Sequence, residues 1–572
     1  MEENLEELER HKNELYRRLG EWGDFRRGTI SVNYRKCGKA YCACAQAGHP
    51  GHGPQYLWNA TIKGESRARN LRLGAELEKV GREVENYRRL IQWWDQWIEV
   101  NEKICQNRPV NRIEDEELEE LKKKIKAEVW QEAQQEIGRL IARLLEAGHK
   151  RGGVDLEASE STIRASMHEL GGRLLEGVLN GDKGDYRGSR IECGQGHQAE
   201  FVGYRNKRLQ TVLAKIELKR AYYHCAVCRA GVIPKDVQLD VAGTCFSHSL
   251  RLMMGRVGAK EAFDEGRRDL KELAGIVVKT KAVERISEAI GQQAEGVSQA
   301  ERHAALSGKL ASVEAAPTLY IAIDGTGVPV VAREREGRKG KQTERAKTRE
   351  AKLGCVFTQT LLDDQGRPRR NQYSTTYVGA IETAEQFGPR IYTEAVRRGL
   401  KRAGRVVVVG DGAPWIWNLA DEHFHDAIQI IDLYHARQHL IELAKSVYGQ
   451  AATKAADWAA GRSQQLDEGN IEAVLTALGR LRPRDEAAQK AVHSALHYFQ
   501  SNANRMHYAD FRSQSLFVGS GVVEAGCKTV IGHRLKQSGM QWTVRGANDI
   551  IALRCLQLSG RWEEFWETRA AG

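Results

Sequence analysis

The most constraining feature of the sequence is an ordered series of apolar strands and helices that begins at residue 316. Three β-branched segments come first and are separated by charged or Gly/Pro turns, which is typical of consecutive strands: "TLYIAIDGTGVPVV", "LGCVFTQTLLDD" and "QYSTTYVGA". A helical segment follows, and then two strand-to-helix steps, "RVVVVGDGAPWIWNLADEHF" and "AIQIIDLYHARQHLIELAKSVYG". This order predicts a mixed sheet that is antiparallel at first, is extended by parallel strands and is covered by helices.

Two acids stand at the ends of predicted buried strands. Asp324 ends the first strand and Asp411 ends the fourth. Asp-Gly is also a common turn pair, but adjacent strand ends would bring both carboxylates near one point. A third acid, Glu524, lies among small residues in "GSGVVEAGCK". Three convergent carboxylates suit Mg²⁺ (or Mn²⁺), and two such ions can activate a water or a 3′-hydroxyl for phosphodiester chemistry.

These motifs carry a resemblance to a known family. Residues 316–572 resemble the RNase H-like DDE transposases of bacterial insertion sequences, and residues 155–572 resemble the ISKra-type group more narrowly. The segments that carry it are "IAIDGTG", "VVVVGDGAPWIWN", "IQIIDLYHARQHL", "GSGVVEAGCKTVIGHRLKQSGMQW" and "RGANDIIALRCLQLSGRWEEFW". The resemblance implies that Asp324, Asp411 and Glu524 form an acidic triad that binds magnesium. It also implies cleavage and strand transfer at the ends of a mobile element.

Further residues around the triad have two interpretations each. Asp432 and His435 in "IDLYHA" resemble the [C/D]-x-x-H motif of transposases with an all-helical insertion, which would span residues 440–515 here. As an i, i+3 pair they would share a helix face and either brace the fold or touch DNA. Trp415 and Trp417 follow Asp411, and they would either stack on an unpaired base or belong to the core.

A first Cys/His group predicts a zinc ribbon. Its four ligands come from "CGQGHQAEF" and "YYHCAVCRAG" and are Cys193, His197, Cys225 and Cys228. Two such knuckles suit a tetrahedral structural Zn²⁺, and the segment between them alternates like a long β-hairpin. His197 stands where a cysteine is more usual, so His224 is an alternative ligand.

A second Cys/His group lies near the N-terminus. Cys37, Cys42 and Cys44 would bind Zn²⁺ with either His49 or His52 as the fourth ligand, and His52 is preferred. The module resembles small uncharacterised proteins associated with such transposases. Basic residues surround the group and could grip phosphates; they are Arg26, Arg27, Arg35, Lys36 and Lys39.

The charge balance indicates a polyanionic partner. The chain has 87 Lys and Arg against 76 Asp and Glu, a net charge of +11, although a basic solvated surface would give the same balance. Residues 270–291 have the pattern of a helix-turn-helix or a plain helical hairpin, with Lys279, Lys281 and Arg285 as groove-facing residues. A basic segment holds Arg338, Lys339 and Lys341 and is either a phosphate contact or a solvated loop. We expect double-stranded DNA as the partner, bound by a homodimer or a higher oligomer.

The chain should therefore divide into several modules. We expect a helical module with a zinc-like knuckle, a long amphipathic helix, a helical segment, a zinc ribbon, a helical DNA-binding region, and a catalytic core interrupted by the insertion: 1–105, 106–150, 151–190, 191–240, 241–312, 313–439, 440–515 and 516–572. No apolar run approaches the ~20 residues that span a bilayer, and the N-terminus has no signal-peptide pattern, so a cytoplasmic protein is expected. The predicted function is DNA transposition; a nuclease without strand transfer and a catalytically silent DNA-binding regulator are the alternatives.

Overall fold

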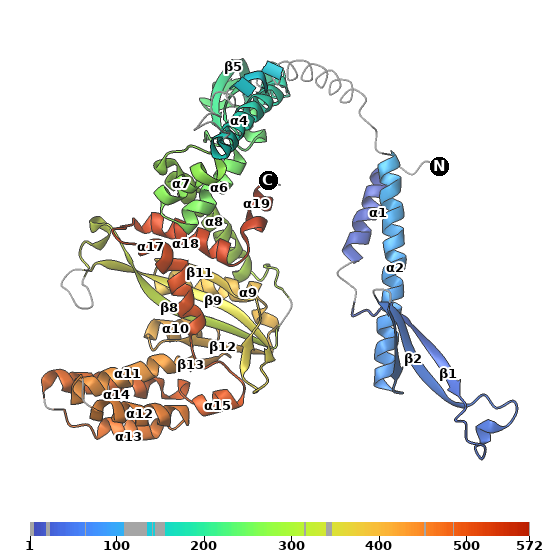
Figure 1. Ribbon diagram of the computed structural model, residues 1–572, viewed down its shortest axis with the longest axis vertical. Coiled ribbons are helices and arrows are strands. Elements are labelled where there is room, and N and C mark those ends of the chain that lie inside the picture. Colours follow the sequence, from blue (N-terminus) through green and yellow to red (C-terminus); the bar gives the residue numbers. More distant parts are fainter. Residues whose placement is uncertain are drawn as a thin grey trace. The chain divides into compact units, whose positions relative to one another are not determined.

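The computed structural model shows a mixed α/β protein with three sheets and many helices (Figure 1). The chain forms two compact units, Met1–Lys124 and Ile125–Gly572. In the described part of the chain, no helix has the length and apolar character needed to cross a membrane. The structure describes residues 5–18, 23–62, 65–107, 134–135, 137–139, 141–142, 155–182, 184–313, 316–338, 346–450, 453–483 and 485–570.

The first unit combines a helical hairpin with a small sheet. Helix α1 (Leu5–Arg18) packs along α2 (Ala75–Asn107), and the indole N–H of Trp93 donates to the Leu15 carbonyl (3.1 Å). The chain between these two helices forms an antiparallel sheet of three strands in the order β1-β2-β3. The strands are β1 (Thr29–Arg35), β2 (His52–Ile62) and β3 (Glu65–Leu71). The sequence predicted the helices and the Cys/His group of this module but not its three strands. The alternation in "TISVNYR" and "QYLWNATI" is the signal that was missed.

The second unit begins with a helix beside a long hairpin. Helix α4 (Leu156–Gly181) packs against a four-stranded sheet of order β4-β5-β6-β7, formed by β4 (Arg190–Glu192), β5 (Gln198–Gln210), β6 (Lys215–Cys225) and β7 (Ala230–Val232). Glu176 and Asn180 of α4 accept hydrogen bonds from the N–H groups of Glu217 and Lys219 (2.8 Å each). These side chains accept hydrogen bonds from backbone N–H groups in the part of β6 that does not pair with β7. They thereby cover a stretch of β6 that would otherwise be an open strand edge. The hairpin predicted between the two knuckles is observed.

Four helices connect this sheet to the central one: α5 (Pro234–Gln238), α6 (His248–Lys260), α7 (Phe263–Ala274) and α8 (Thr280–Leu306). Helix α7 ends at Gly275, whose φ of 69° is left-handed and suits glycine. The turn expected between two helices within residues 270–291 is observed, since α8 begins at Thr280. The long amphipathic helix expected around residues 118–144 lies almost wholly outside the described residues.

The central sheet has the order β10-β9-β8-β12-β13, and β11 also pairs with β9. Strands β9, β10 and β11 are joined by antiparallel pairing, as are β8 and β9, whereas β12 lies parallel to both β8 and β13. The predicted arrangement of antiparallel strands followed by parallel ones is observed. The strands are β8 (Thr318–Pro329), β9 (Thr348–Leu362), β10 (Pro368–Arg370), β11 (Thr376–Ala380), β12 (Arg405–Gly410) and β13 (Ile428–Ile431).

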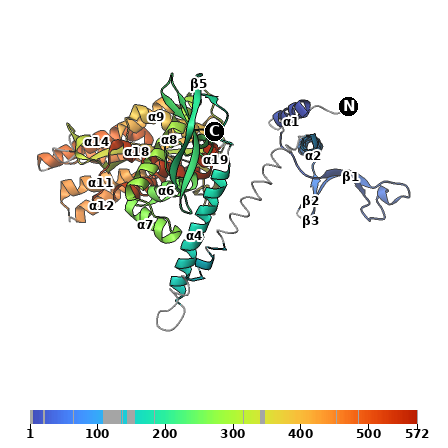
Figure 2. The same cartoon turned by 90° about the horizontal axis from the view of Figure 1, so that it is seen from above.

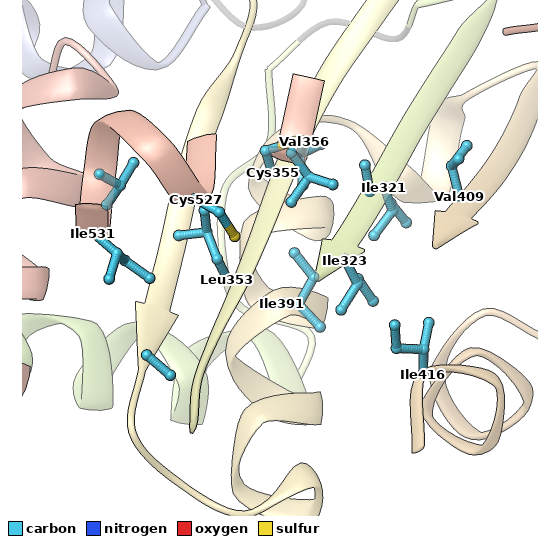
Figure 3. Packing of buried hydrophobic residues seen from close by; sticks show 14 of the residues in the cluster. Ile321, Ile323, Leu353, Cys355, Val356, Ile391, Val409, Ile416, Cys527 and Ile531 are labelled. Carbon is cyan, nitrogen blue, oxygen red and sulfur yellow. The ribbon is translucent and has the colours of Figure 1, made fainter. Parts of the chain in front are cut away.

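Helices cover both faces of this sheet. A Cβ on Gly354 would meet Ile391 of α9 (Ala384–Arg397), whereas Gly526 at the end of α16 (Gly521–Gly526) approaches Leu353 on the opposite face. Figure 3 shows Ile391 and Ile416 packed on one side of the strands and Cys527 on the other. The π-helix η6 (Cys527–Gly532) contacts β8, and α18 (Val544–Leu558) contacts β11. The other helices of this region are α10 (Pro414–His423), α17 (His533–Leu535) and α19 (Trp562–Ala570).

A set of helices separates β13 from α16. Helix α11 (Leu433–Tyr448) follows β13 directly, and α12 and α14 both pack on it (Figure 1 and Figure 2). This all-helical segment consists of α12 (Thr453–Asp467), α13 (Ile471–Gly479), α14 (Glu486–Asn502) and α15 (Tyr508–Ser513).

Candidate active site

The parallel register of the central sheet brings Asp324 and Asp411 together. The last pair between β12 and β8 is Gly410 with Ile323, so Asp411, which follows β12, lies level with Asp324. The prediction that Asp324 ends its strand is wrong, because β8 continues to Pro329 through its pairing with β9. Burial raises the pKa of the Asp324 carboxyl, and the negative charge of Asp411 raises it further. The Gly325 N–H, which donates to Asp324 Oδ1 (2.6 Å), acts in the opposite direction. Two carboxylates that repel each other in a half-buried position form a site that favours a cation.

A third acid, Asp432, lies at the same level of the sheet, but both of its carboxylate oxygens accept hydrogen bonds from the protein. Gly410 pairs with Ile431 of β13, so Asp411 and Asp432 directly follow paired residues of neighbouring strands. Asp432 is buried, and its Oδ1 accepts the N–H groups of Tyr434 (2.6 Å) and His435 (3.0 Å). It therefore caps α11 and does not share a helix face with His435, because the helix begins at the next residue.

The other carboxylate oxygen of Asp432 reaches across to α16. Its Oδ2 accepts the N–H of Ser520 (2.7 Å) and also the Ser520 hydroxyl. Ser520 is the residue that precedes α16, the helix of Glu524. Asp432 thus joins the start of α11 to the start of α16 and has a bracing position.

Glu524 lies close to the sheet but directs its carboxylate to the surface. Helix α16 packs against β8 and β9, and this approach requires Gly526, because a Cβ there would lie 2.9 Å from Tyr377. The Glu524 side chain is exposed and forms an ion pair with Lys528 (2.8 Å). The structure therefore brings Asp324 and Asp411 together, whereas the Glu524 carboxylate is paired with Lys528 on the neighbouring helix.

Cys527 is a site residue that sequence analysis missed. It begins the π-helix η6, is buried, and hydrogen-bonds to Asp324. Burial raises the pKa of the Cys527 thiol, and the charge of Asp324 raises it further, so the thiol acts as a weak donor. π-helices are rare in proteins, and those that occur often lie at functional sites. The only sequence signal was the position of Cys527 three residues after Glu524.

Two histidines and a tyrosine surround the Asp411 side of the site. Burial lowers the pKa of His439, and the neighbouring His435 lowers it further. The His439 ring lies 4.2 Å from the Tyr498 ring, centroid to centroid. Tyr498 comes from α14 of the helical segment, and its Cε2 would lie 1.9 Å from a Cβ on Gly412. Gly412 therefore has to be glycine for this ring to pack beside Asp411.

The two predicted stacking residues differ in accessibility. Trp417 is 4% exposed and belongs to the core, where the Arg505 guanidinium lies 4.7 Å from its ring centroid. Trp415 is half-buried, with Lys352 Nζ 4.8 Å from its ring centroid. Of the two interpretations that the sequence allowed for Trp417, stacking on a base or packing in the core, the structure supports packing in the core.

The predicted DNA-contacting cations are exposed wherever the structure describes them. Lys279, Lys281 and Arg285 lie at the start of α8, and Lys281 forms an ion pair with Glu284 (2.6 Å). Arg338 is exposed at the end of a described segment. Lys339 and Lys341 lie outside the described residues.

Both predicted Cys/His groups come together in space. In the ribbon, the ligand atoms of Cys193, His197, Cys225 and Cys228 all lie within 4.8 Å of one another. Cys228 Sγ is 3.5 Å from Cys193 Sγ and 3.0 Å from His197 Nδ1. His224 does not belong to this group. Sulfurs bound to one tetrahedral Zn²⁺ lie about 3.8 Å apart, so these four side chains fit the ion.

The N-terminal group has similar geometry. Cys37, Cys42, Cys44 and His52 also lie within 4.8 Å of one another. Cys37 Sγ is 3.5 Å from Cys44 Sγ, and Cys42 Sγ is 3.0 Å from His52 Nε2. His49 instead accepts the Gly51 N–H through its Nδ1 (3.0 Å). The structure therefore selects His52, the preferred of the two predicted candidates.

Comparisons with known proteins cover these parts of the chain unequally. Residues 5–82 match a family model described as "Domain of unknown function (DUF6788)". No curated protein matches the chain. Among solved structures, the chain is similar to one described as "Drosophila P element transposase strand transfer complex", at 10% identity and a TM-score of 0.19, over 59% of this chain and 84% of that chain. A TM-score this low leaves the question of function to the residues of the site.

Proposed function

We propose that this protein is a DDE-type DNA transposase that binds the ends of an insertion sequence and catalyses DNA cleavage and strand transfer. The observation that carries the proposal is the shared level of Asp324, within β8, and Asp411, directly after the parallel neighbouring strand β12. A pair of acids in that position can hold a cation at the carboxyl end of β12, and ligands of α/β proteins commonly bind at the carboxyl ends of parallel strands.

The sheet order supports an RNase H-like core. Three antiparallel strands come first in the chain and two parallel strands are added beside the first of them. One acid lies on the first strand and the next directly follows β12. The all-helical segment then precedes α16 and Glu524, as expected for a triad whose last member follows an insertion.

The donor set fits magnesium. Asp324 and Asp411 offer hard oxygen ligands, and Glu524 would become the third once its carboxylate separates from Lys528. Bound Mg²⁺ would supply activation of a water or 3′-hydroxyl and stabilisation of the leaving oxygen. The chain's own contribution is to hold the acids: Gly325 and Ala413 donate backbone N–H groups to Asp324 and Asp411, and Asp432 fixes the start of α16.

Zinc and DNA complete the proposal. The two Cys/His groups would each hold one structural Zn²⁺, and the exposed cations at the start of α8 would contact the DNA backbone. Pairing two element ends requires at least two protomers, so we expect a homodimer or a higher oligomer on double-stranded DNA.

The test uses the full chain with a supercoiled plasmid that carries the gene and its native flanks, in Mg²⁺ or Mn²⁺. Breaks at the element boundaries together with joined ends are the expected products. Asp411→Asn should abolish both while leaving zinc content and DNA binding unchanged. The matched control is Asp426→Asn, which removes the same charge from an exposed turn before β13.

Three other outcomes have separate meanings. Breaks without joined ends would make the protein a nuclease. DNA binding without breaks in either metal would favour the catalytically silent regulator. Full activity of Asp411→Asn would remove the assignment of the site.

A further inference from the structure

The three-stranded sheet of the first unit has one covered face and one open face. Side chains alternate across a strand, and the cross-strand register assigns each to a face. Ile30, Tyr56, Trp58 and Leu71 share one face and pack against Leu77, Val80 and Val84 at the start of α2. The opposite face, which we call the open face, is not part of that apolar cluster. Its two central cross-strand rows are Thr29–Asn59–Ala68 and Ser31–Leu57–Asn70.

The open face is uncharged but rich in hydrogen-bonding groups. Asn33 and Gln55 form a further cross-strand pair on it, and both are exposed. The Asn59 amide is held in place, since its Nδ2 donates to Ser31 Oγ (2.8 Å). Neither an Asp nor a Glu stands on this face. Amides and hydroxyls mixed with small apolar groups form a surface suited to the edges of DNA bases, because Asn and Gln pair with adenine and apolar groups contact the thymine methyl.

The rim of the open face is strongly basic. Residues 23–72 contain nine Lys and Arg but only two Asp and Glu, so this short segment supplies most of the chain's net charge of +11. Arg35 and Lys36 are exposed at the end of β1, and Arg72 is exposed directly after β3. An uncharged centre with a cationic rim matches a duplex, in which base edges lie at the bottom of a groove flanked by phosphates.

The dimensions of the sheet also fit. Neighbouring strands lie about 4.8 Å apart, so the outer strands are separated by roughly 10 Å. The major groove of B-form DNA is about 12 Å wide and admits a two-stranded β-ribbon, and some DNA-binding sheets place strands in it. The deep, narrow major groove of A-form RNA would not admit the sheet.

We propose that the open face of β1–β3 enters the major groove of double-stranded DNA and reads base edges, while the basic rim contacts the flanking phosphates. This assigns a chemical role to a domain whose family description states none. It deepens the proposed transposase function by placing sequence recognition on a named surface. It is nevertheless testable by binding alone, so its failure is distinguishable from failure of the proposed cleavage activity.

The test selects preferred sequences from random-sequence DNA duplexes with the zinc-loaded full chain, in buffer without magnesium or manganese. The variant Gln55→Ala/Asn70→Ala removes two amides from the open face. Its control, Gln92→Ala/Gln96→Ala, removes two exposed amides from α2 of the same unit. We expect the open-face variant to lose its preference for the selected duplex over random duplex by roughly 10-fold or more, since one base contact contributes ~1–3 kcal/mol. The control should keep its preference.

A rim variant separates phosphate contact from base reading. Arg35→Gln/Arg72→Gln should weaken binding to selected and random duplexes by the same factor and reduce the dependence of binding on salt. Unchanged preference in the open-face variant would overturn the proposal. So would a wild-type protein that selects no sequence, or that binds single strands or RNA as tightly as duplex DNA.

One measurement does not depend on the folding of any variant. Methylation of guanine N7 probes the major groove directly, and the wild-type protein should protect guanines inside its selected sequence. Protection of adenine N3, which lies in the minor groove, without protection of guanine N7 would contradict the proposal. Zinc content and circular dichroism of each variant show whether the sheet is intact.

Discussion

The carboxylate of Asp432 accepts hydrogen bonds from both the backbone N–H (2.7 Å) and the hydroxyl of Ser520, 88 residues further along the chain. The two residues precede α11 and α16, so one buried carboxylate fixes the starts of both helices. Helix α11 carries His435 and α16 carries Glu524. This contact therefore holds the helices that precede and follow the helical segment next to each other at the candidate site.

Breaking this contact should be costly. Asp432→Ala removes the acceptor of four hydrogen bonds and should lower the free energy of unfolding by about 2–4 kcal/mol, while Ser520→Ala removes one and should lower it by about 1 kcal/mol. Urea titration of both single variants and the double variant gives their coupling. Because the hydroxyl bond exists only with Asp432, the double variant should be no less stable than Asp432→Ala. Strict additivity would show that the two side chains act independently.

Gly412 and Tyr498 give a second test, of the contact between the helical segment and the Asp411 loop. A Cβ on Gly412 would lie 1.9 Å from the Tyr498 ring, so Gly412→Ala should displace the ring and destabilise the protein by about 1–3 kcal/mol. It should also slow DNA cleavage, because the displaced loop carries Asp411. Adding Tyr498→Ala should relieve the clash and recover part of the lost stability.

The control for this prediction is Gly461→Ala. Gly461 lies within α12, and a Cβ there would meet no atom within 4 Å. Since alanine is the better helix former, this change should be neutral or stabilise by up to ~1 kcal/mol. Equal unfolding midpoints for Gly412→Ala and the wild type would contradict the packing of Tyr498.

The sequence predicted the central sheet well because its strands are consecutive, apolar and bounded by turn residues. That order predicted that the strands carrying Asp324 and Asp411 are neighbours, but not that β8 continues past Asp324 to Pro329. The contacts of Cys527 and Tyr498 could not be predicted from the sequence. They join segments that are far apart in the chain, and such contacts produce no periodic pattern in the local sequence. The small N-terminal sheet was missed for another reason: its strands lie between two segments with dominant helical patterns. A sequence motif also does not show where a carboxylate points, so the exposed ion pair of Glu524 with Lys528 was not predicted.

Lys528 should compete with magnesium for Glu524. Their ion pair is exposed, so its removal should have little effect on stability. If Glu524 has to leave Lys528 to bind the ion, Lys528→Gln should reach half-maximal cleavage at a few-fold lower Mg²⁺ concentration. Glu524→Gln should abolish cleavage at every Mg²⁺ concentration. The control is Lys490→Gln, at an exposed position on α14. An unchanged Mg²⁺ dependence of Lys528→Gln would show that the ion pair does not oppose metal binding.

The zinc sites should be separable by mutation. The full chain should contain two zinc ions, one in each Cys/His group. Cys225→Ser should reduce the content to one ion and destabilise the ribbon, while leaving the first unit loaded. Cys44→Ser should do the converse. Elemental analysis of purified variants measures this directly, and a wild-type content of one ion would show that one of the two groups does not bind zinc.

Asp549 predicts a pH dependence of stability that is independent of any metal. Burial, helped by the charges of Glu288 and Glu295 and opposed by Arg545, raises the pKa of this α18 carboxyl to about 6. The folded protein therefore holds a proton between about pH 4 and pH 6 that the unfolded chain has released, and stability falls as the pH rises through this window. Asp549→Asn removes the charge, so it should be more stable than the wild type by about 1–2 kcal/mol at neutral pH. The difference should shrink toward zero as the pH falls to about 4, where Asp549 is protonated in both states. Urea unfolding across this range measures the difference, and a wild type that matches Asp549→Asn at neutral pH would show that the buried carboxyl is not destabilising when charged.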